Sequence, residues 1–262
     1  MIKAKKSLGQ NFLIDQDIIN KIINTGSIKN KNILEIGPGT GNLTKAILSK
    51  NPKSLLVVEK DKALSILLNR NFEKQITIIN EDILKLNEKN IINDKLVVFG
   101  NLPYNISTEI LCKWIVNLEN DEFWFEELIL MFQKEVADRI IAKLNTSNYG
   151  RLTILTNWKL NVKKICDIGP NSFSPKPKIE STLLHFEPKK DFFKFKNPLN
   201  LEKITRIFFN HRRKMIKKPF NQIFSENKNV SEKLNLDLNL RPQNLDLITY
   251  YNLTREYEKL RS

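Results

Sequence analysis

The sequence is short of the residue types that define several protein classes. Its 262 residues include only two cysteines and two histidines, and neither pair has the spacing of a metal site or of a disulfide framework. No apolar run approaches the roughly 18 residues that span a bilayer, and the first residues lack the apolar core of a secretory signal. We therefore expect a cytoplasmic protein with no bound metal and no membrane partner.

Positive charge, in contrast, is abundant. The formal net charge is +14, from 43 lysines and arginines against 29 acidic residues. Such an excess favours a polyanionic partner, nucleic acid before membrane. A genome biased towards lysine codons would raise the charge as well, so the distribution of the charge along the chain has to decide between the two.

Strand and helix signals alternate through the first 190 residues. Short β-branched or apolar runs predict strands at 32–36, 54–58, 76–79, 95–99, 128–132, 160–168 and 181–186. Helical spacing predicts helices at 17–24, 42–50, 62–70, 107–118, 134–144 and 151–158. This alternation predicts an α/β fold, with a parallel sheet covered by helices on both faces.

The pattern changes after Pro188. Residues 191–200 are typical of a linker, and only helical signals follow, from Leu201 onward. Pro219, the Asn- and Leu-rich stretch 227–240 and the pair Arg241-Pro242 are expected to separate three or four short helices. We therefore predict a first domain at 1–190 and a small helical domain at 191–262.

A glycine-rich loop follows the first predicted strand. Gly37, Gly39 and Gly41 have G-x-G-x-G spacing, which differs from the G-x-G-x-x-G spacing of dinucleotide sites. Such a loop lets the backbone approach a ligand at a helix N-terminus. Glu35, just before it, would repel a pyrophosphate and attract a sulfonium cation. These features favour S-adenosyl-L-methionine over a nicotinamide cofactor.

The next strands deliver polar side chains to the same edge of the predicted sheet. Glu59 ends the second strand, where an acid can bind a ribose diol. Asp82 follows the third strand, where a carboxylate can accept a hydrogen bond from an adenine amino group. Either acid alone would more often be an ordinary solvent-facing carboxylate. Because Glu35, Glu59, Asp82 and then Asn101 follow four successive strands, we interpret the set as a cofactor site.

Asn101-Leu102-Pro103-Tyr104 follows the fourth of these strands. An adenine amino group is a poor nucleophile, because its lone pair is delocalised into the ring. Asn101 Oδ1 and a backbone carbonyl at Leu102 or Pro103 could accept its two hydrogens and so favour a pyramidal nitrogen. Tyr104 could stack on the base, and Pro103 would hold the turn rigid. The alternative is an ordinary Asn-Pro turn after a strand.

The chain resembles the ribosomal RNA adenine N6,N6-dimethyltransferases, most closely the bacterial enzymes that act on 16S rRNA. The resemblance spans nearly the whole chain. Matching segments are 9–13, 35–41, Glu59, Asp82, 101–107, 133–136, 149–151, 173–181 and 211–214.

This resemblance implies a Rossmann-like S-adenosylmethionine-dependent methyltransferase fold, with a mostly parallel seven-stranded sheet and a small all-α C-terminal domain. It implies that Gln10, Asn11 and Leu13 contact the cofactor and that Phe173 packs the target base. The implied reaction places two methyl groups on each of two adjacent adenosines in the 3′-terminal hairpin loop of 16S rRNA. The implied partner is an immature 30S subunit, and we expect a monomer.

Basic residues concentrate early in the helical region. Residues 194–218 contain nine lysines or arginines and a single acid, Glu202. A solvated helix face is the ordinary explanation of a charge run, but the single sign of this run favours contact with an RNA backbone. The residues that we expect to bind RNA are Lys203, Arg206, Arg212, Arg213, Lys214, Lys217 and Lys218.

Several alternatives remain open at this point. A methyltransferase acting on 23S rRNA, of the antibiotic-resistance type, would use the same catalytic residues. The protein could also be mainly an RNA-binding factor in 30S assembly. A DNA adenine methyltransferase is less favoured, because its motif usually begins with Asp and carries two prolines. A nicotinamide oxidoreductase is the last alternative.

Overall fold

The computed structural model describes residues 4–5, 8–91, 94–118, 122–225 and 228–261. The chain packs into two compact units. The first consists of Met1–Lys113, Leu118–Ala137 and Val162–Pro188, and the second of Trp114–Asn117, Asp138–Asn161 and Lys189–Ser262. The chain passes between units at residue 188, near the predicted boundary, but the second unit also includes two segments from the middle of the chain. The assignment of 1–190 to catalysis and 191–262 to RNA docking stays a prediction.

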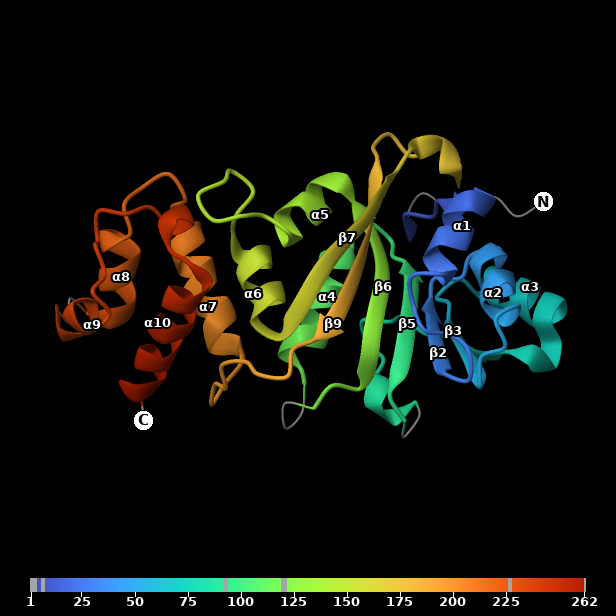
Figure 1. Cartoon of the computed structure of the whole chain (residues 1–262), viewed down its shortest axis with the longest axis horizontal. Coiled ribbons are helices and arrows are strands. Elements are labelled where there is room, and N and C mark those ends of the chain that lie inside the picture. The colour runs from blue at the N-terminus through green and yellow to red at the C-terminus, as the bar shows by residue number, and fades with distance from the viewer. Residues whose placement is uncertain (1–3, 6–7, 92–93, 119–121, 226–227, 262) are drawn as a thin grey trace. The chain divides into compact units, whose positions relative to one another are not determined.

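A seven-stranded sheet forms the frame of the first unit (Figure 1). Its strands are β2 (Asn32–Ile36), β3 (Ser54–Val58), β4 (Thr77–Ile79), β5 (Leu96–Asn101), β6 (Phe125–Gln133), β7 (Leu160–Ile168) and β9 (Ser181–Pro188). Their order is β4-β3-β2-β5-β6-β9-β7. The pairs β4–β3, β3–β2, β2–β5 and β5–β6 are parallel, and β9 runs antiparallel to β6. The predicted fold class is confirmed.

The central strands are buried on both faces, which is why their sequences are nearly continuous apolar runs. Alternate residues point to opposite faces of the sheet. On one face Ile33, Val97 and Ile129 of three neighbouring strands belong to one core cluster with Ile22 and Ile47 of the adjacent helices. The sheet is therefore a rigid platform that carries the loops at its carboxyl edge.

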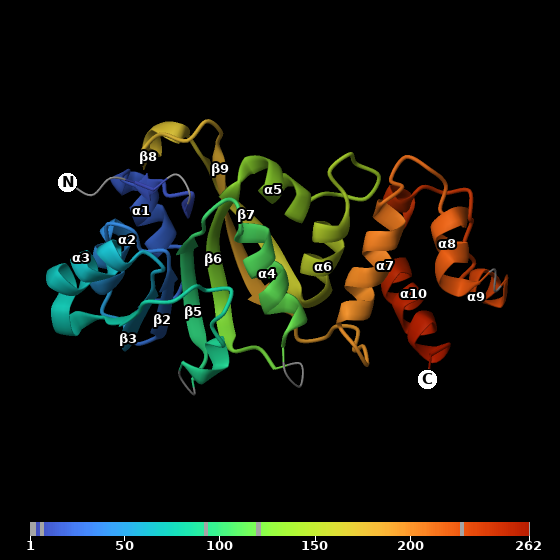
Figure 2. The ribbon, with the colours of Figure 1, turned by 180° about the vertical axis from the view of Figure 1, so that it is seen from behind.

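Five helices begin in the described part of the first unit. They are α1 (Gln16–Ile23), α2 (Asn42–Leu48), α3 (Lys62–Phe72), α4 (Ser107–Val116) and α5 (Lys134–Ile140). Seen from behind, α4 lies in front of β7 and β9 (Figure 2). Asp15 and Asp61 cap α1 and α3 through their side chains. The helix predicted at 134–144 ends at Ile140, before the polar stretch Asn145–Asn148.

A second, two-stranded sheet holds the N-terminal segment in place. β1 (Phe12–Leu13) pairs antiparallel with β8 (Phe173–Ser174), with Leu13 opposite Phe173. The Ile14 amide extends this contact by donating to the Ser172 carbonyl at 2.9 Å. This pairing was not predicted, because two-residue strands carry no periodic signal. It brings residues 8–13 to the carboxyl edge of the main sheet.

The second unit is helical. It contains α6 (Arg151–Lys159), α7 (Leu199–Phe209), α8 (Lys217–Phe224), α9 (Lys228–Lys233) and α10 (Leu247–Lys259). α7 packs on α10, with the Phe208 and Tyr250 rings 5.7 Å apart. The expectation that Pro219 separates two helices is wrong. Pro219 lies in the first turn of α8, where its missing N–H has no partner to lose.

No helix in the part of the chain that the structure describes is long and apolar enough to cross a membrane.

Candidate active site

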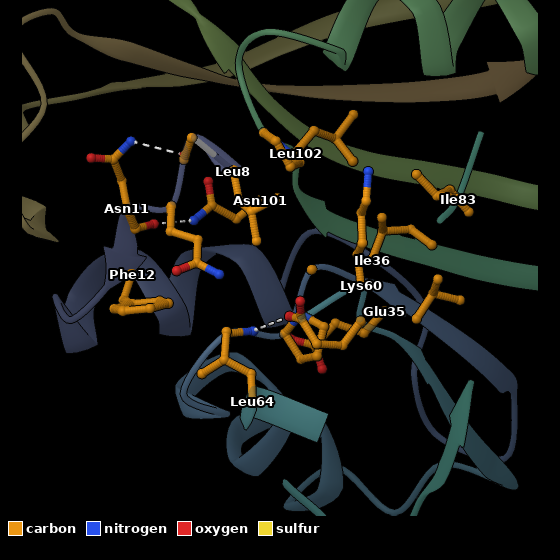
Figure 3. Close-up of a pocket in the computed structure, with 18 of the residues that line it drawn as sticks. Leu8, Asn11, Phe12, Glu35, Ile36, Lys60, Leu64, Ile83, Asn101 and Leu102 are labelled. Carbon is orange, nitrogen blue, oxygen red and sulfur yellow. Dashed lines mark hydrogen bonds between the residues drawn. The ribbon is translucent and has the colours of Figure 1, made fainter. Parts of the chain in front are cut away.

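A pocket opens at the carboxyl ends of β2, β3 and β5, within the first unit (Figure 3). Most of the predicted site residues line it together, although they lie far apart in the sequence. They are Gln10, Asn11, Leu13, Glu35, Gly37, Gly39, Glu59, Asp82, Asn101, Leu102, Pro103 and Tyr104. The strand ends therefore meet as expected for an open α/β sheet.

Two of the residues predicted to bind the cofactor or the target base do not line this pocket. Gly41 is the N-cap of α2, with φ +86°, and a Cβ there would lie 2.5 Å from the Phe72 ring. Gly41 therefore lets the loop turn tightly against Phe72, outside the pocket lining. Phe173 is 3% exposed and belongs to the core cluster that also contains Leu13. Its expected contact with the target base stays a prediction.

The sequence reasoning missed several apolar wall residues. Ile36, Leu64 and Ile83 line the pocket between the predicted polar groups, as does the aliphatic stem of Lys60 (Figure 3). Ile36 ends a strand and Ile83 follows one, but Leu64 comes from helix α3. A pocket lined by both apolar side chains and carboxylates suits an adenosine group. The only sequence signal for Ile36 and Ile83 is their proximity to strand ends, and Leu64 lies in the helix that follows β3.

Glu35 lies at the bottom of the site and is 1% exposed. Thr44 of α2 donates a hydrogen bond to Glu35 Oε2 at 2.7 Å. Burial raises the pKa of Glu35 to about 8, although the Thr44 hydrogen bond opposes this. At pH 7 the carboxyl is therefore mostly protonated before a cation binds, which differs from the full negative charge assumed from the sequence.

Replacing Glu35 by glutamine is expected to flatten the pH dependence of folding stability. The pKa of Glu35 is raised from 4.5 to about 8. Between these values the unfolded chain loses a proton that the folded protein keeps, so the free energy of unfolding falls as pH rises, by at most about 1.4 kcal/mol per pH unit. Urea unfolding from pH 5 to 9 measures this, and an equally steep decline in E35Q would contradict the assignment.

Glu59 follows the end of β3 and is buried. Its carboxylate accepts from the Asp61 amide at 2.8 Å and from the Gly39 amide at 3.4 Å. Burial raises the pKa of Glu59, and these amide hydrogen bonds hold the rise back. Because Gly39 belongs to the glycine-rich loop, Glu59 connects that loop to the end of β3. A ribose diol could donate hydrogen bonds to the Glu59 carboxylate there.

Asp82 is more open. Lys60 Nζ donates to Asp82 Oδ2 at 2.8 Å, and the Leu84 amide donates to Oδ1 at 3.1 Å. The Lys60 hydrogen bond lowers the pKa of Asp82, so this carboxylate is charged at neutral pH. A charged acceptor beside Ile83 suits the edge of an adenine ring.

Asn101 is oriented by the N-terminal segment. Its Nδ2 donates to the Asn11 carbonyl at 2.8 Å (Figure 3). This contact fixes which end of the amide is nitrogen. Among the described residues no hydrogen bond uses Asn101 Oδ1. The oxygen is therefore available as the acceptor that the sequence predicted.

Tyr104 is half-buried, and its hydroxyl hydrogen-bonds to Ser181 Oγ at 2.5 Å. Burial raises the pKa of Tyr104, so the phenol is neutral at physiological pH. The side chain can supply a ring face, but it cannot act as a general base.

The predicted RNA-binding residues fall into two groups in the second unit. Lys203 Nζ donates to the Tyr257 hydroxyl, and Arg212 Nη2 donates to the Tyr149 carbonyl at 2.7 Å. These two cations hold the unit together, which does not follow from a charge run. The remaining five are exposed: Arg206, Arg213, Lys214, Lys217 and Lys218.

The fold and this pocket together define the class of S-adenosylmethionine-dependent methyltransferases, with S-adenosyl-L-methionine as methyl donor. The chain belongs to the family described as ribosomal RNA adenine dimethylase, whose pattern matches residues 1–259. Membership of this family excludes the oxidoreductase alternative.

The relatives agree with this assignment. A ribosomal RNA small subunit methyltransferase A from Pelagibacter ubique is 65% identical, over 99% of each chain. One with the same name from Ehrlichia ruminantium is 44% identical, over 94% of each chain. A dimethyladenosine transferase structure from Plasmodium falciparum has a TM-score of 0.78 and 27% identity, over 95% of this chain and 98% of its own. A 23S rRNA methyltransferase, ErmE, shares the fold, with a TM-score of 0.69 and 19% identity over 95% and 100%.

The residues present fit this methyl donor. Glu59 and Asp82 line the pocket as acceptors, together with apolar side chains and with Gly37 and Gly39 of the glycine-rich loop. Among the described residues, no three His, Cys, Asp or Glu side chains are grouped so that they could hold a metal ion.

Proposed function

We propose that this protein places two methyl groups on the N6 nitrogen of each of two adjacent adenosines in the 3′-terminal hairpin loop of 16S rRNA. The substrate is an immature 30S subunit, and the reaction contributes to small-subunit biogenesis in the cytoplasm. The observation that carries the proposal is the orientation of Asn101, whose Nδ2 is bound by the Asn11 carbonyl. We infer a monomeric enzyme.

Asn101 Oδ1 accepts one hydrogen of the adenine amino group in this proposal, and a backbone carbonyl at Leu102 or Pro103 accepts the other. These contacts favour a pyramidal nitrogen whose lone pair is directed at the methyl group. Leu102 is 1% exposed, which anchors the turn. Catalysis is then mostly positioning. No strong base is required, because the alkylated nitrogen loses its proton readily.

Tyr104 stacks on the adenine ring. A base–aromatic stack is worth about 1–3 kcal/mol, and the hydrogen bond between the Tyr104 and Ser181 hydroxyls helps to hold the side chain in place. Loop adenines are already partly unstacked, so moving one into the pocket costs less than extracting it from a duplex.

S-adenosyl-L-methionine supplies an electrophilic methyl group when it is bound. Glu59 is placed to accept from its ribose hydroxyls, and Asp82 from its adenine amino group. The side-chain amide of Gln10 is hydrogen-bonded within the chain to Lys5 and Asp61, and its expected contact with the cofactor stays a prediction.

The assignment to the small subunit is tested with isolated ribosomal particles. Unmethylated 30S and 50S subunits are each incubated with the protein and labelled S-adenosylmethionine, and the product base is located by mass mapping. We expect label only in 30S, as dimethyladenosine at two adjacent positions. Label in 50S would favour the 23S alternative.

Reversing the charge of Arg213 and Lys214 is expected to weaken RNA binding. Both side chains are exposed, and neither supports the packing of its unit in the way that Arg212 does. Losing two phosphate contacts should flatten the plot of log affinity against log salt by about two. R213E/K214E is compared with K29E/K45E, which reverses two exposed lysines of the first unit. An unchanged slope in R213E/K214E would remove this turn from the RNA interface.

A further inference from the structure

Asp61 is a buried acid for which the proposed reaction has no use. It is 3% exposed and caps α3, accepting from the Ala63 amide at 3.0 Å. A cap needs only one of its acceptor sites. The same carboxylate also accepts from Lys5 Nζ at 2.8 Å and from Gln10 Nε2 at 3.1 Å.

The backbone of Asp61 contacts the cofactor site directly. Its amide donates to Glu59 Oε1 at 2.8 Å, which positions the acid that we assign to the ribose. One residue therefore contacts both Glu59 and the N-terminal segment. Charge-assisted hydrogen bonds are the stronger kind, and the Asp61 carboxylate is buried although the Lys5 side chain is half-exposed.

One partner of Asp61, Gln10, belongs to a segment that lines the pocket, and the other, Lys5, lies upstream of that segment in the sequence. We call residues 8–13 the roof segment, since all six line the pocket. Its downstream end is held by β1–β8 pairing and by Asn42, whose Nδ2 donates to the Leu13 carbonyl at 2.7 Å. Its middle supplies the Asn11 carbonyl that binds Asn101. Gln10, bound to Asp61, is the next residue upstream.

We propose that Asp61 is a positioning residue that holds the roof segment over the cofactor and thereby keeps Asn101 oriented. We call Asp61, Lys5 and Gln10 the clasp. Gln10 Oε1 accepts from the Lys5 amide at 2.7 Å, so the two partners of Asp61 are also hydrogen-bonded to one another. Cofactor affinity depends on the clasp, because a segment already fixed in its bound position loses less conformational freedom on binding. The effect on Asn101 rests on the proposed function; the effect on cofactor affinity does not.

The clasp is tested by cofactor binding in the full chain. Q10A and K5L remove its two partners without touching the cap on α3. We expect each to raise the Kd for S-adenosylmethionine, measured by calorimetry, by roughly 10-fold, as for loss of a hydrogen bond to a charged group. K5R should keep near-normal affinity. The control is D246N, which neutralises the N-cap of α10 in the second unit and should leave the Kd unchanged.

Hydrogen exchange separates positioning from general destabilisation. In Q10A and K5L we expect faster exchange confined to the roof segment, with an unchanged thermal midpoint. The double variant Q10A/D61N is compared with Q10A alone and D61N alone. Its affinity for the cofactor should be no lower than that of the weaker-binding single variant, because both changes break the same contact between Gln10 and Asp61. An unchanged Kd in Q10A and K5L, additive effects in the double variant, or faster exchange throughout the first unit would overturn the proposal. Failure of methyl transfer to 30S would leave these binding results standing.

Discussion

Replacing Asn101 by alanine is expected to abolish methyl transfer, with kcat reduced by at least about 100- to 1,000-fold, the range found when one preorganised hydrogen-bonding group is removed from a polar active site. The variant loses the acceptor Oδ1 and also leaves the Asn11 carbonyl without its 2.8 Å partner. Binding of S-adenosylmethionine should change much less, because Glu59 and Asp82 remain. Single-turnover assays on unmethylated 30S particles measure the rate.

N101D and N69A complete this experiment. Aspartate keeps an acceptor but loses the donor to Asn11, so we expect a partial defect that separates the two functions of the amide. Asn69 is an exposed asparagine on α3, away from the pocket lining, and N69A should behave as wild type. Normal kcat in N101A would show that Asn101 does not orient the nucleophile.

Replacing Glu59 by alanine is expected to give the largest loss of cofactor affinity, with the Kd for S-adenosylmethionine raised roughly 100-fold or more. Two hydrogen bonds from a ribose diol to one carboxylate would be lost together, each worth about 1.5–3 kcal/mol. The change also frees the Gly39 and Asp61 amides, which now donate to Glu59. Isothermal calorimetry measures the affinity directly.

E59Q and E109Q distinguish a binding defect from disorder of the loop. Glutamine keeps one acceptor oxygen for the Asp61 amide, so E59Q should fold normally and still bind cofactor poorly. E109Q changes an exposed acid on α4 and should have no effect. RNA affinity should be equal in all of these variants, because Glu59 lies inside the cofactor pocket. Wild-type cofactor affinity in E59A would remove Glu59 from the ribose site.

The sheet and its carboxyl edge could be predicted because buried parallel strands are continuous apolar runs that end abruptly. β2 and β3 occupy the predicted ranges, and β5 extends two residues further, to Asn101 itself. Since parallel strands end at the same edge, the position of Glu35, Glu59 and Asn101 at one site followed from the order of the elements.

Contacts that depend on distant parts of the chain could not be predicted. The pairing of Leu13 with Phe173 joins residues 160 positions apart through strands two residues long. Arg212 and Arg213 are adjacent and chemically identical, yet Arg212 binds the Tyr149 carbonyl and Arg213 is exposed. The link from Gln10 to Asp61 likewise joins the N-terminal segment to the N-cap of α3, 51 positions further along the chain.

We propose that this protein makes the dimethyladenosines of the 16S 3′-terminal loop. The most direct test is mass mapping of rRNA from cells that lack the protein, complemented with the wild-type chain or with N101A. We predict that two adjacent dimethyladenosines are absent without the protein, return with the wild-type chain and stay absent with N101A. Dimethyladenosine still present in that loop in the uncomplemented cells would contradict the account.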